Sequence, residues 1–350
     1  MRRLSAITVS FLTSFSMISH AQTVLNIHEW EGYLSPFSAE FEKYALDEKG
    51  IDVKLNFIKP NITSADDIFV VARAKKADIV TPTHNYFKME KGKLFNVLSP
   101  IDTSLLSNYS KVTQSLRNAD FDKKNNTKYS VPLLGGSYGL AYNADRVPAP
   151  DSWNVLWDDK SKGKYAVTND QYEANLYIAL LISGHAPNTF YDLKKNKLNK
   201  ADIQLKVDKL AKNAHSFWQG LADAEKMKEL DYVTTYWFGV ADANKQGQNW
   251  KMASPKEGQT VWLDTMSIVK HVNDDPAKKV AAHLLLDFMI QKDIQTKLHK
   301  LYGSVIVNQA ASQELKLDPN FFIEEYLWQP LDSRTRNLYK LIWSKAMDKR

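Results

Sequence analysis

A tryptophan and an aspartate two residues apart form the pair with the clearest chemistry in the sequence. They are Trp262 and Asp264, within the run 259–269, which is rich in β-branched and large apolar residues and contains no Gly or Pro. Such a run predicts a strand, in which residues two apart share one face at about 6.6 Å. The carboxylate suits a cation, and the indole suits that cation's methylene stem. A core tryptophan beside an exposed strand-end aspartate is the alternative interpretation.

The composition places this pair in an ordinary globular protein. The chain has 350 residues, of which 44% are hydrophobic and 25% charged, enough for two domains. Cysteine is absent, which excludes disulfides, thiolate metal sites and a cysteine nucleophile. The net charge of +6 comes from scattered lysines rather than from a basic patch interleaved with aromatics. We therefore expect no nucleic-acid partner.

The first residues predict export. A basic start, Met1-Arg2-Arg3, precedes an apolar stretch over 4–18 and the small-x-small sequence Ser19-His20-Ala21. This pattern predicts a signal peptide over residues 1–21 with cleavage after Ala21. The apolar stretch is too short for a stable membrane anchor, and no cysteine follows to carry a lipid. We expect a mature protein that is not membrane-inserted, in the periplasm of a Gram-negative bacterium.

The order of elements predicts where binding residues gather. Strands are expected over 24–28 and 51–57 around a helix, a βαβ unit that favours a parallel sheet. Ligands bind at the carboxyl ends of strands in such sheets. The first strand is followed by Trp30, Glu31 and Tyr33, and the strand from residue 77 is followed by Thr83, His84 and Asn85, so we expect both groups at one edge.

A second α/β set is expected from about residue 162. Asp170 and Glu173 open its apolar helix over 174–181, although Glu173 could equally be a capping residue in the first turn. The pair Gly135-Gly136 predicts a break between two strands, either a hinge or a bulge. Residues 232–239, which include Trp237, predict a strand ending in aromatics.

Catalytic motifs are missing from the sequence. It contains no His-Glu-x-x-His helix, no comparable metal-ligand spacing, no Gly-x-Ser-x-Gly elbow and no phosphate loop. His84 and His28 stand alone, as hydrogen-bonded loop or core histidines usually do. Paired carboxylates could in principle serve glycoside chemistry. We expect a binding protein rather than an enzyme, with no cofactor and no metal site.

Several short motifs occur in a characteristic order. They are Trp30-x-x-Tyr33, Ala77-Asp78-Ile79-Val80-x-Pro82-Thr83, Thr168-Asn169-Asp170-x-x-Glu173, Trp237-x-Gly239, Trp262-x-Asp264 and Trp328-Gln329. With them, nearly the whole mature chain resembles the spermidine/putrescine-binding family, the periplasmic polyamine-binding proteins of ABC importers. The resemblance implies a two-lobed α/β fold of the type II-like periplasmic binding protein class, with mixed sheets flanked by helices and a hinge. Lobe 1 is expected over 22–134 plus 263–310, and lobe 2 over 135–262 plus 311–350.

The resemblance also implies a site in which aromatic rings enclose methylenes and carboxylates hold ammonium groups. The expected aromatic box is Trp30, Tyr33, Trp237 and Trp262; the carboxylates are Asp264, Glu173 and Asp170; Thr83 and Gln329 are polar contacts. Four positions depart from the family pattern: Glu31, Asn85, Val240 and Ser304. They leave the choice among putrescine, spermidine and norspermidine open, and Asp170 with Glu31 favours a triamine.

The expected function is capture of a polyamine by a monomer and its delivery to an ABC importer permease. A periplasmic polyamine sensor is the alternative, docking on a membrane cyclic-di-GMP receptor and regulating biofilm-type signalling. Another ligand in the same cleft, such as a sugar or a metal chelate, is a further alternative, which the three candidate acids disfavour.

Overall fold

The computed structural model describes residues 22–350 except 31, 63, 193–197, 221 and 319. Two predictions therefore lie outside the described residues, namely the signal peptide over 1–21 and the ligand role of Glu31.

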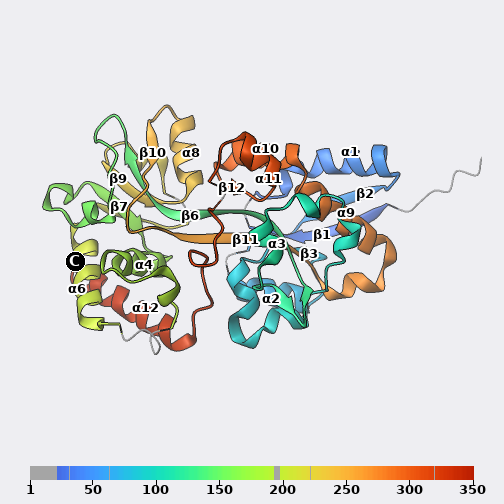
Figure 1. Ribbon diagram of the computed structural model, residues 1–350, viewed down its shortest axis with the longest axis horizontal. Helices are drawn as coiled ribbons and strands as arrows, with labels where there is room; N and C mark the ends of the chain where they lie inside the picture. Colours follow the sequence, from blue (N-terminus) through green and yellow to red (C-terminus); the bar gives the residue numbers. More distant parts are fainter. Residues whose placement is uncertain (1–21, 31, 63, 193–197, 221, 319) are drawn as a thin grey trace, which may run out of the picture.

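The described chain forms two α/β lobes side by side (Figure 1). A mixed sheet continues through both, in the strand order β2-β1-β3-β11-β6-β9-β7-β8, with β10 and β12 also paired to β6. Its strands are β1 Thr23–His28, β2 Val53–Phe57, β3 Ile79–Val80, β6 Val131–Asn143, β7 Tyr165–Thr168, β8 Ser216–Trp218, β9 Tyr232–Thr235, β10 Trp250–Met252, β11 Thr260–Ile268 and β12 Val305–Ile306. A separate hairpin joins β4 Lys123–Lys124 to β5 Thr127–Lys128.

Helices cover this sheet in both lobes (Figure 1). The α-helices are α1 Ser38–Lys49, α2 Ala65–Arg73, α3 Gln114–Asn118, α4 Tyr172–Ile182, α6 Lys200–Asn213, α7 Ala224–Met227, α8 Trp237–Lys245, α9 Pro276–Met289, α10 Lys292–Tyr302, α11 Gln309–Glu314 and α12 Ser333–Asp348. The 3-10 helices are η1 Ser35–Phe37, η2 His84–Lys91, η3 Lys93–Asn96, η4 Thr103–Leu105, η5 Tyr109–Lys111, η6 Trp153–Trp157, η7 Asp159–Ser161, η8 Pro187–Thr189 and η9 Lys270–Asp274.

In lobe 1 the predicted βαβ unit is confirmed. Strand β1 pairs in parallel with β2 on one side and with β3 on the other, so the loops after β1 and β3 leave the same sheet edge. Helices α1 and α9 pack together through Phe41 and Phe288, whose ring centroids are 5.4 Å apart. This packing fixes the strands whose ends carry Tyr33 and Thr83.

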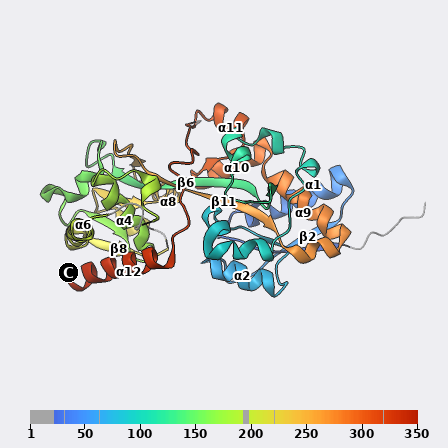
Figure 2. The same ribbon diagram turned by 60° about the horizontal axis from the view of Figure 1, so that its bottom comes forward.

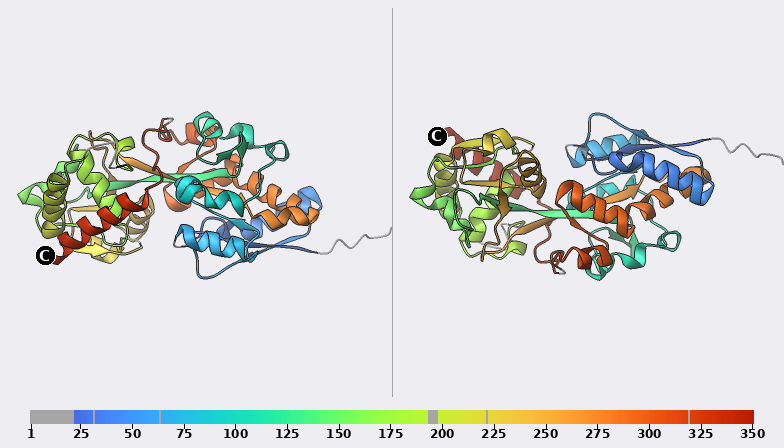
Figure 3. Two further views of the ribbon diagram at one scale, coloured as in Figure 1. Left: turned by 90° about the horizontal axis from the view of Figure 1, so that it is seen from below. Right: turned by 90° about the horizontal axis from the view of Figure 1, so that it is seen from above.

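In lobe 2 the strand β7 leads into α4, which is buried over almost its whole length, from Ala174 to Leu181. A helix that is apolar on all its faces is stable in water only when other elements of the protein pack around it. Helices α6 and α12 lie beside it in Figures 2 and 3. The start of α4 is thereby held beside the junction of the lobes.

Strands β6 and β11 run from one lobe into the other as an antiparallel pair (Figures 1 and 2). Strand β11 also pairs with β3 of lobe 1. A third crossing segment, residues 320–332, runs beside β11. The Val261 N–H donates to the Tyr326 oxygen at 2.8 Å, and the Trp328 N–H donates to the Val261 oxygen at 2.9 Å. Trp262 and Asp264 therefore lie at the junction of the lobes.

Two sequence-based expectations about these elements are wrong. The glycine pair does not break a strand, because β6 is continuous from Val131 to Asn143. A Cβ at Gly135 would lie 2.5 Å from the Trp262 oxygen, and one at Gly136 would lie 2.9 Å from the indole of the same residue. The glycines thus allow close approach of β11. The aromatic run after residue 235 is not strand either, since Trp237 begins α8.

Candidate ligand-binding cleft

Asp264 is a buried carboxylate whose described hydrogen-bond partners are both neutral hydroxyl groups. Its side chain is 4% exposed. The Thr83 hydroxyl donates to Oδ1 at 2.6 Å, and the Tyr33 hydroxyl donates a second hydrogen bond. Burial raises the pKa of Asp264 to about 7, an effect that these two hydroxyls partly offset. Among the described residues, no basic side chain lies within 4 Å of Asp264.

Tyr33 holds Asp264 from the loop after β1. The phenol is 7% exposed and packs edge-on against Tyr302, with ring centroids 5.9 Å apart. Burial, with the charge of Asp264, raises the pKa of Tyr33 well above its ordinary value. The phenol therefore stays protonated and acts as a donor. The Tyr302 hydroxyl donates to the Gly32 oxygen, which fixes the loop.

Trp262 forms an aromatic surface beside this carboxylate. It is 5% exposed, and its ring packs against Tyr236 and Phe238, each with centroids 6.1 Å away. Trp30 and Trp237 are half-buried, and the Trp30 N–H donates to the Thr81 hydroxyl at 3.0 Å. The indole N–H groups of four tryptophans are buried without a partner among the described residues: Trp30, Trp237, Trp262 and Trp328.

Glu173 lies in the first turn of α4, across the junction from Tyr86 of η2. Burial raises the pKa of the Glu173 carboxyl, and the Tyr172 hydroxyl and the charge of Arg336 partly offset this rise. Burial also raises the pKa of Tyr86, to which the negative charges of Asp264 and Glu173 both contribute. Tyr86 thus lies within electrostatic reach of both candidate carboxylates, one on β11 and one on α4.

Asp170 and Gln329 are engaged locally. Asp170 is exposed; its two oxygens accept from the Thr168 hydroxyl and the Gly220 N–H, each at 2.8 Å. The Gln329 amide donates to the Leu327 oxygen at 3.1 Å and lines a cavity of about 220 Å³ between the third crossing segment and lobe 1. Neither makes a described hydrogen bond to the group around Asp264.

His84 joins three chain segments. Its Nε2–H donates to the Trp328 oxygen at 2.7 Å, and its Nδ1 accepts from the Leu263 N–H at 3.2 Å. This arrangement requires the neutral ring, and burial lowers the pKa of His84 to about 4. His28 likewise contacts the Pro60 oxygen, at 3.1 Å. The expectation that these are hydrogen-bonded histidines is confirmed.

The sequence reasoning missed several residues at the junction: Tyr86, Tyr236, Phe238, Tyr302 and Arg336. Two of them carried a signal. Tyr86 follows Asn85, and Tyr302 precedes Ser304 by two residues, and Asn85 and Ser304 are the positions where an aromatic hydroxyl is missing from the expected pattern. A search one or two residues away from each departure would have found both phenols.

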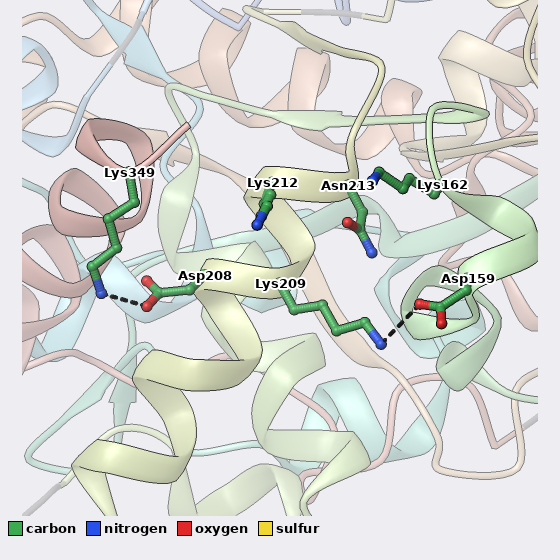
Figure 4. A pocket seen from close by; sticks show the side chains of 7 residues that line it. All are labelled: Asp159, Lys162, Asp208, Lys209, Lys212, Asn213 and Lys349. Atoms are coloured by element: carbon green, nitrogen blue, oxygen red, sulfur yellow. Dashed lines mark hydrogen bonds and ion pairs between the residues drawn. The ribbon is translucent and has the colours of Figure 1, made fainter.

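A second hollow lies in lobe 2, between α6 and the C-terminal end of α12 (Figure 4). It measures about 670 Å³ and is lined by Asp159, Lys162, Asp208, Lys209, Lys212, Asn213 and Lys349. Lys209 pairs with Asp159 at 3.2 Å, and Lys349 pairs with Asp208 at 2.5 Å. None of these described lining residues is aromatic, so the hollow offers no ring against which a methylene chain could stack.

Within the described ranges, no group of three or more His, Cys, Asp or Glu side chains is placed to hold a metal ion. In the same part of the chain, no helix has the length and apolar character needed to cross a bilayer.

The chain is similar in sequence to known periplasmic binding proteins. A spermidine/putrescine-binding periplasmic protein from Haemophilus influenzae is 26% identical over 313 residues, covering 86% of this chain and 81% of that protein. The spermidine/putrescine-binding periplasmic protein of Escherichia coli K12 is 27% identical over 298 residues, covering 83% and 79%. These relatives confirm the family resemblance inferred from the motifs.

The fold is also that of a solved solute-binding protein. The structure of the spermidine/putrescine ABC transporter substrate-binding protein PotD from Streptococcus pneumoniae superposes with a TM-score of 0.74 at 21% identity, covering 93% of this chain and 99% of that one. The family model described as bacterial extracellular solute-binding protein matches residues 74–324. The chain therefore belongs to the bacterial extracellular solute-binding protein family.

Proposed function

We propose that this protein captures a polyamine between its lobes and delivers it to an ABC importer. Members of a solute-binding family bind rather than transform their ligands, so the protein is not an enzyme. The observation that carries the proposal is the state of Asp264, a buried carboxylate with two hydroxyl donors and no described cation.

An uncompensated buried carboxylate is costly in the empty protein. A ligand ammonium placed beside Asp264 would supply the missing positive charge. The ionised form would then be favoured, and the unfavourable desolvation would be offset by the ligand rather than by the fold. Thr83 and Tyr33 already orient the carboxylate, so little order has to be gained on binding.

The aromatic residues support a ligand with an apolar stem. The Trp262 ring packs against Tyr236 and Phe238. It also lies over Gly136, where a larger residue would collide with the indole. Methylenes gain from contact with such rings, and a nearby ammonium gains cation–π attraction. The names of the relatives from Haemophilus influenzae and Escherichia coli support the same ligand class.

The test is calorimetric titration of the mature protein, refolded to remove bound ligand, with putrescine, spermidine, norspermidine and spermine. We expect tight binding of at least one of them. Replacing Asp264→Asn together with Glu173→Gln should weaken that binding at least about 100-fold, because removing one partner of a buried charge pair costs about 2–5 kcal/mol. No heat with any polyamine would contradict the proposal.

A matched control removes the same two charges elsewhere. Glu40 and Glu314 are exposed carboxylates that pair with Lys297 and Lys292. The double variant Glu40→Gln with Glu314→Gln should bind within about twofold of the unaltered protein, since surface ion pairs contribute little. Equal losses in both double variants would mean that net charge, rather than the cleft, controls affinity.

The remaining parts of the proposal concern location and organisation. Residues 1–21 act as a signal peptide cleaved after Ala21, and the protein works as a monomer in the periplasm. Lobe 1 comprises 22–134 plus 263–310, and lobe 2 comprises 135–262 plus 311–350. Two of these boundaries fall inside β6 and β11, which join the lobes. Mass spectrometry of the exported protein, with a first residue other than Gln22, would refute the cleavage position.

Delivery needs its own test, because a polyamine sensor would require the same cleft. Deleting the gene should reduce uptake of radiolabelled polyamine into intact cells, and a plasmid copy should restore it. Normal uptake together with altered cyclic-di-GMP would instead support a sensor that docks on a membrane signalling receptor.

A further inference from the structure

One guanidinium is fixed at the junction from the side of lobe 2. Arg336 lies near the start of α12, on the same helical face as Tyr339 and Trp343, three and seven residues further on. That face packs on lobe 2, with Tyr339 edge-on to Tyr177 at 6.3 Å and the Trp343 indole donating to Asn169 at 3.1 Å. Figure 2 shows α12 starting where the lobes meet and ending at the far end of lobe 2.

The Arg336 side chain reaches the other lobe. Its Nη2 lies 4.0 Å from the sulfur of Met89 in η2, the 3-10 helix that also carries Tyr86. Arg336 is half-buried, and no carboxylate whose side chain the structure describes forms an ion pair with its guanidinium. Among the described side chains, the positive charge thus has no direct ion pair that would neutralise it.

The neighbours of Arg336 belong to one end of the candidate site. Burial raises the pKa of Glu173, and the positive charge of Arg336 acts in the opposite direction. The same charge opposes the rise in the pKa of Tyr172 and of Tyr86. The pKa of Asp264 depends on burial, Thr83 and Tyr33. The positive charge of Arg336 therefore influences Glu173 and not Asp264. At Asp264, the positive charge would come from the ligand.

We propose that Arg336 is a specificity-determining residue that limits how many ammonium groups the cleft accepts. The inference rests on the proposed polyamine function. A polyamine anchored at Asp264 by one ammonium extends its later ammonium groups towards Glu173. There the positive charge of Arg336 repels these ammonium groups, and it already stabilises the negative charge of Glu173 with which they would interact. Like charges brought together cost several kcal/mol, and rejecting a ligand by such repulsion is a common source of specificity.

The proposal alters the preference drawn from the sequence. Asp170 with Glu31 favoured a triamine, but Arg336 is 163 residues beyond Glu173 in the chain and did not enter that reasoning. In the structure, both oxygens of Asp170 already accept hydrogen bonds, from Thr168 and Gly220. The positive charge of Arg336 partly offsets the negative charge of Glu173. The cleft therefore favours shorter, less charged polyamines than its carboxylates alone would.

The experiment compares one diamine with one triamine. Putrescine and norspermidine are titrated into the unaltered mature protein and into the Arg336→Gln variant. We expect the affinity for norspermidine, relative to that for putrescine, to rise at least about tenfold in the variant, since tenfold corresponds to about 1.4 kcal/mol. Arg336→Lys keeps the charge and should leave the ratio within about threefold of its original value.

A neighbouring arginine provides the matched control. Arg334 lies on the exposed side of the same helix, and Arg334→Gln should leave both affinities unchanged. Thermal unfolding of each variant verifies that α12 still packs. An equal change for both ligands in Arg336→Gln, or a selective loss of norspermidine, would overturn the proposal.

Failure of the proposed function would look different. If the unaltered protein binds none of the polyamines, the function itself is wrong and this inference falls with it. If the unaltered protein instead binds an ω-amino acid, and Arg336→Gln abolishes that binding, Arg336 holds a ligand carboxylate. That result would overturn both proposals.

Discussion

Two buried aspartates lie at opposite ends of β3, and the protein treats them differently. Asp78, just before the strand, is 1% exposed. It accepts from Lys278 at 2.9 Å, from His271 at 3.0 Å and from the Asn26 N–H at 2.8 Å. Asp264, bridged to Thr83 just after the strand, is 4% exposed and is contacted by hydroxyls.

The difference separates a structural carboxylate from one that awaits a ligand. The cation that Asp78 requires comes from α9 of the same lobe, so its charge is balanced as soon as the chain folds. The positive charge that Asp264 requires is absent from its described surroundings, and burial raises the pKa of this carboxyl to about 7. Burial alone would not distinguish the two. The identity of their partners does.

The largest expected effect comes from removing the structural carboxylate. Asp78→Asn should lower the free energy of unfolding by about 3–5 kcal/mol, because it leaves the partly buried Lys278 without its partner. Denaturant titration measures this. Polyamine affinity of the folded variant should stay within about twofold. Adding Lys278→Met should recover part of the lost stability, and a further loss instead would contradict the ion-pair explanation.

Removing the ligand carboxylate should have the opposite effect on the empty protein. The folded-state pKa of Asp264, about 7, lies above the ordinary value of 3.8. The folded state therefore binds more protons between these values, and stability falls as pH rises through that window. The Asp264→Asn variant does not lose stability in this way. The free energy of unfolding of the variant, minus that of the unaltered protein, should therefore rise by about 2–4 kcal/mol between pH 4 and pH 8.

The measurement is chemical unfolding of ligand-free protein at several pH values. The difference between the two proteins is the informative quantity, because His84 titrates in both and cancels. Its pKa is lowered to about 4, so its own contribution runs the other way and stability increases with pH. A difference in the free energy of unfolding that does not change with pH would refute the raised pKa of Asp264.

Ligand affinity should follow the ionisation of the same group. An ammonium pairs with the ionised carboxylate, so below about pH 7 affinity should fall by about tenfold per pH unit. Calorimetry at pH 8 and at pH 5.5, in buffers of different ionisation enthalpy, should also show proton release at the lower pH. The residual binding of Asp264→Asn should lose this slope. A slope that persists would assign it to another group.

The smallest expected effect concerns one hydroxyl. Tyr33→Phe removes a donor to Asp264 and should weaken polyamine binding about fivefold at pH 8, since a single hydrogen bond contributes about 1 kcal/mol. The pH at which affinity begins to fall should also move upward, because one group that lowers the pKa of Asp264 is gone. An unchanged midpoint would mean that Thr83 alone controls the carboxylate.

The strand that carries Trp262 and Asp264 could be predicted from sequence because its signal is local. Alternation put both residues on one face, and the rule for strand ends brought Thr83 and Tyr33 to the same edge. The structure has all of these at the junction. Trp237 was predicted to lie within a strand over 232–239, and the strand propensity of the aromatics hid that β9 ends at Thr235 and that Trp237 begins α8.

The rest depended on contacts that no spacing reveals. Tyr86 reaches the site from a 3-10 helix, whose short period gives no clear pattern. Arg336 comes from a helix that follows the third crossing segment, and only the packing of α12 directs it to the junction. Asp170 matched a motif, but its loop engages both of its oxygens, a detail decided by backbone geometry.

The paired strands β6 and β11 have a mechanical consequence. They stay hydrogen-bonded to each other through the junction, where β12 also pairs with β6 and residues 326–328 also pair with β11; paired strands can change their twist while keeping the ladder. Any rotation of one lobe against the other is therefore absorbed as torsion spread over several residues, and sliding along the strands would require breaking the ladder. A change in the angle between the lobes would therefore change the twist of β6 and β11 rather than their register.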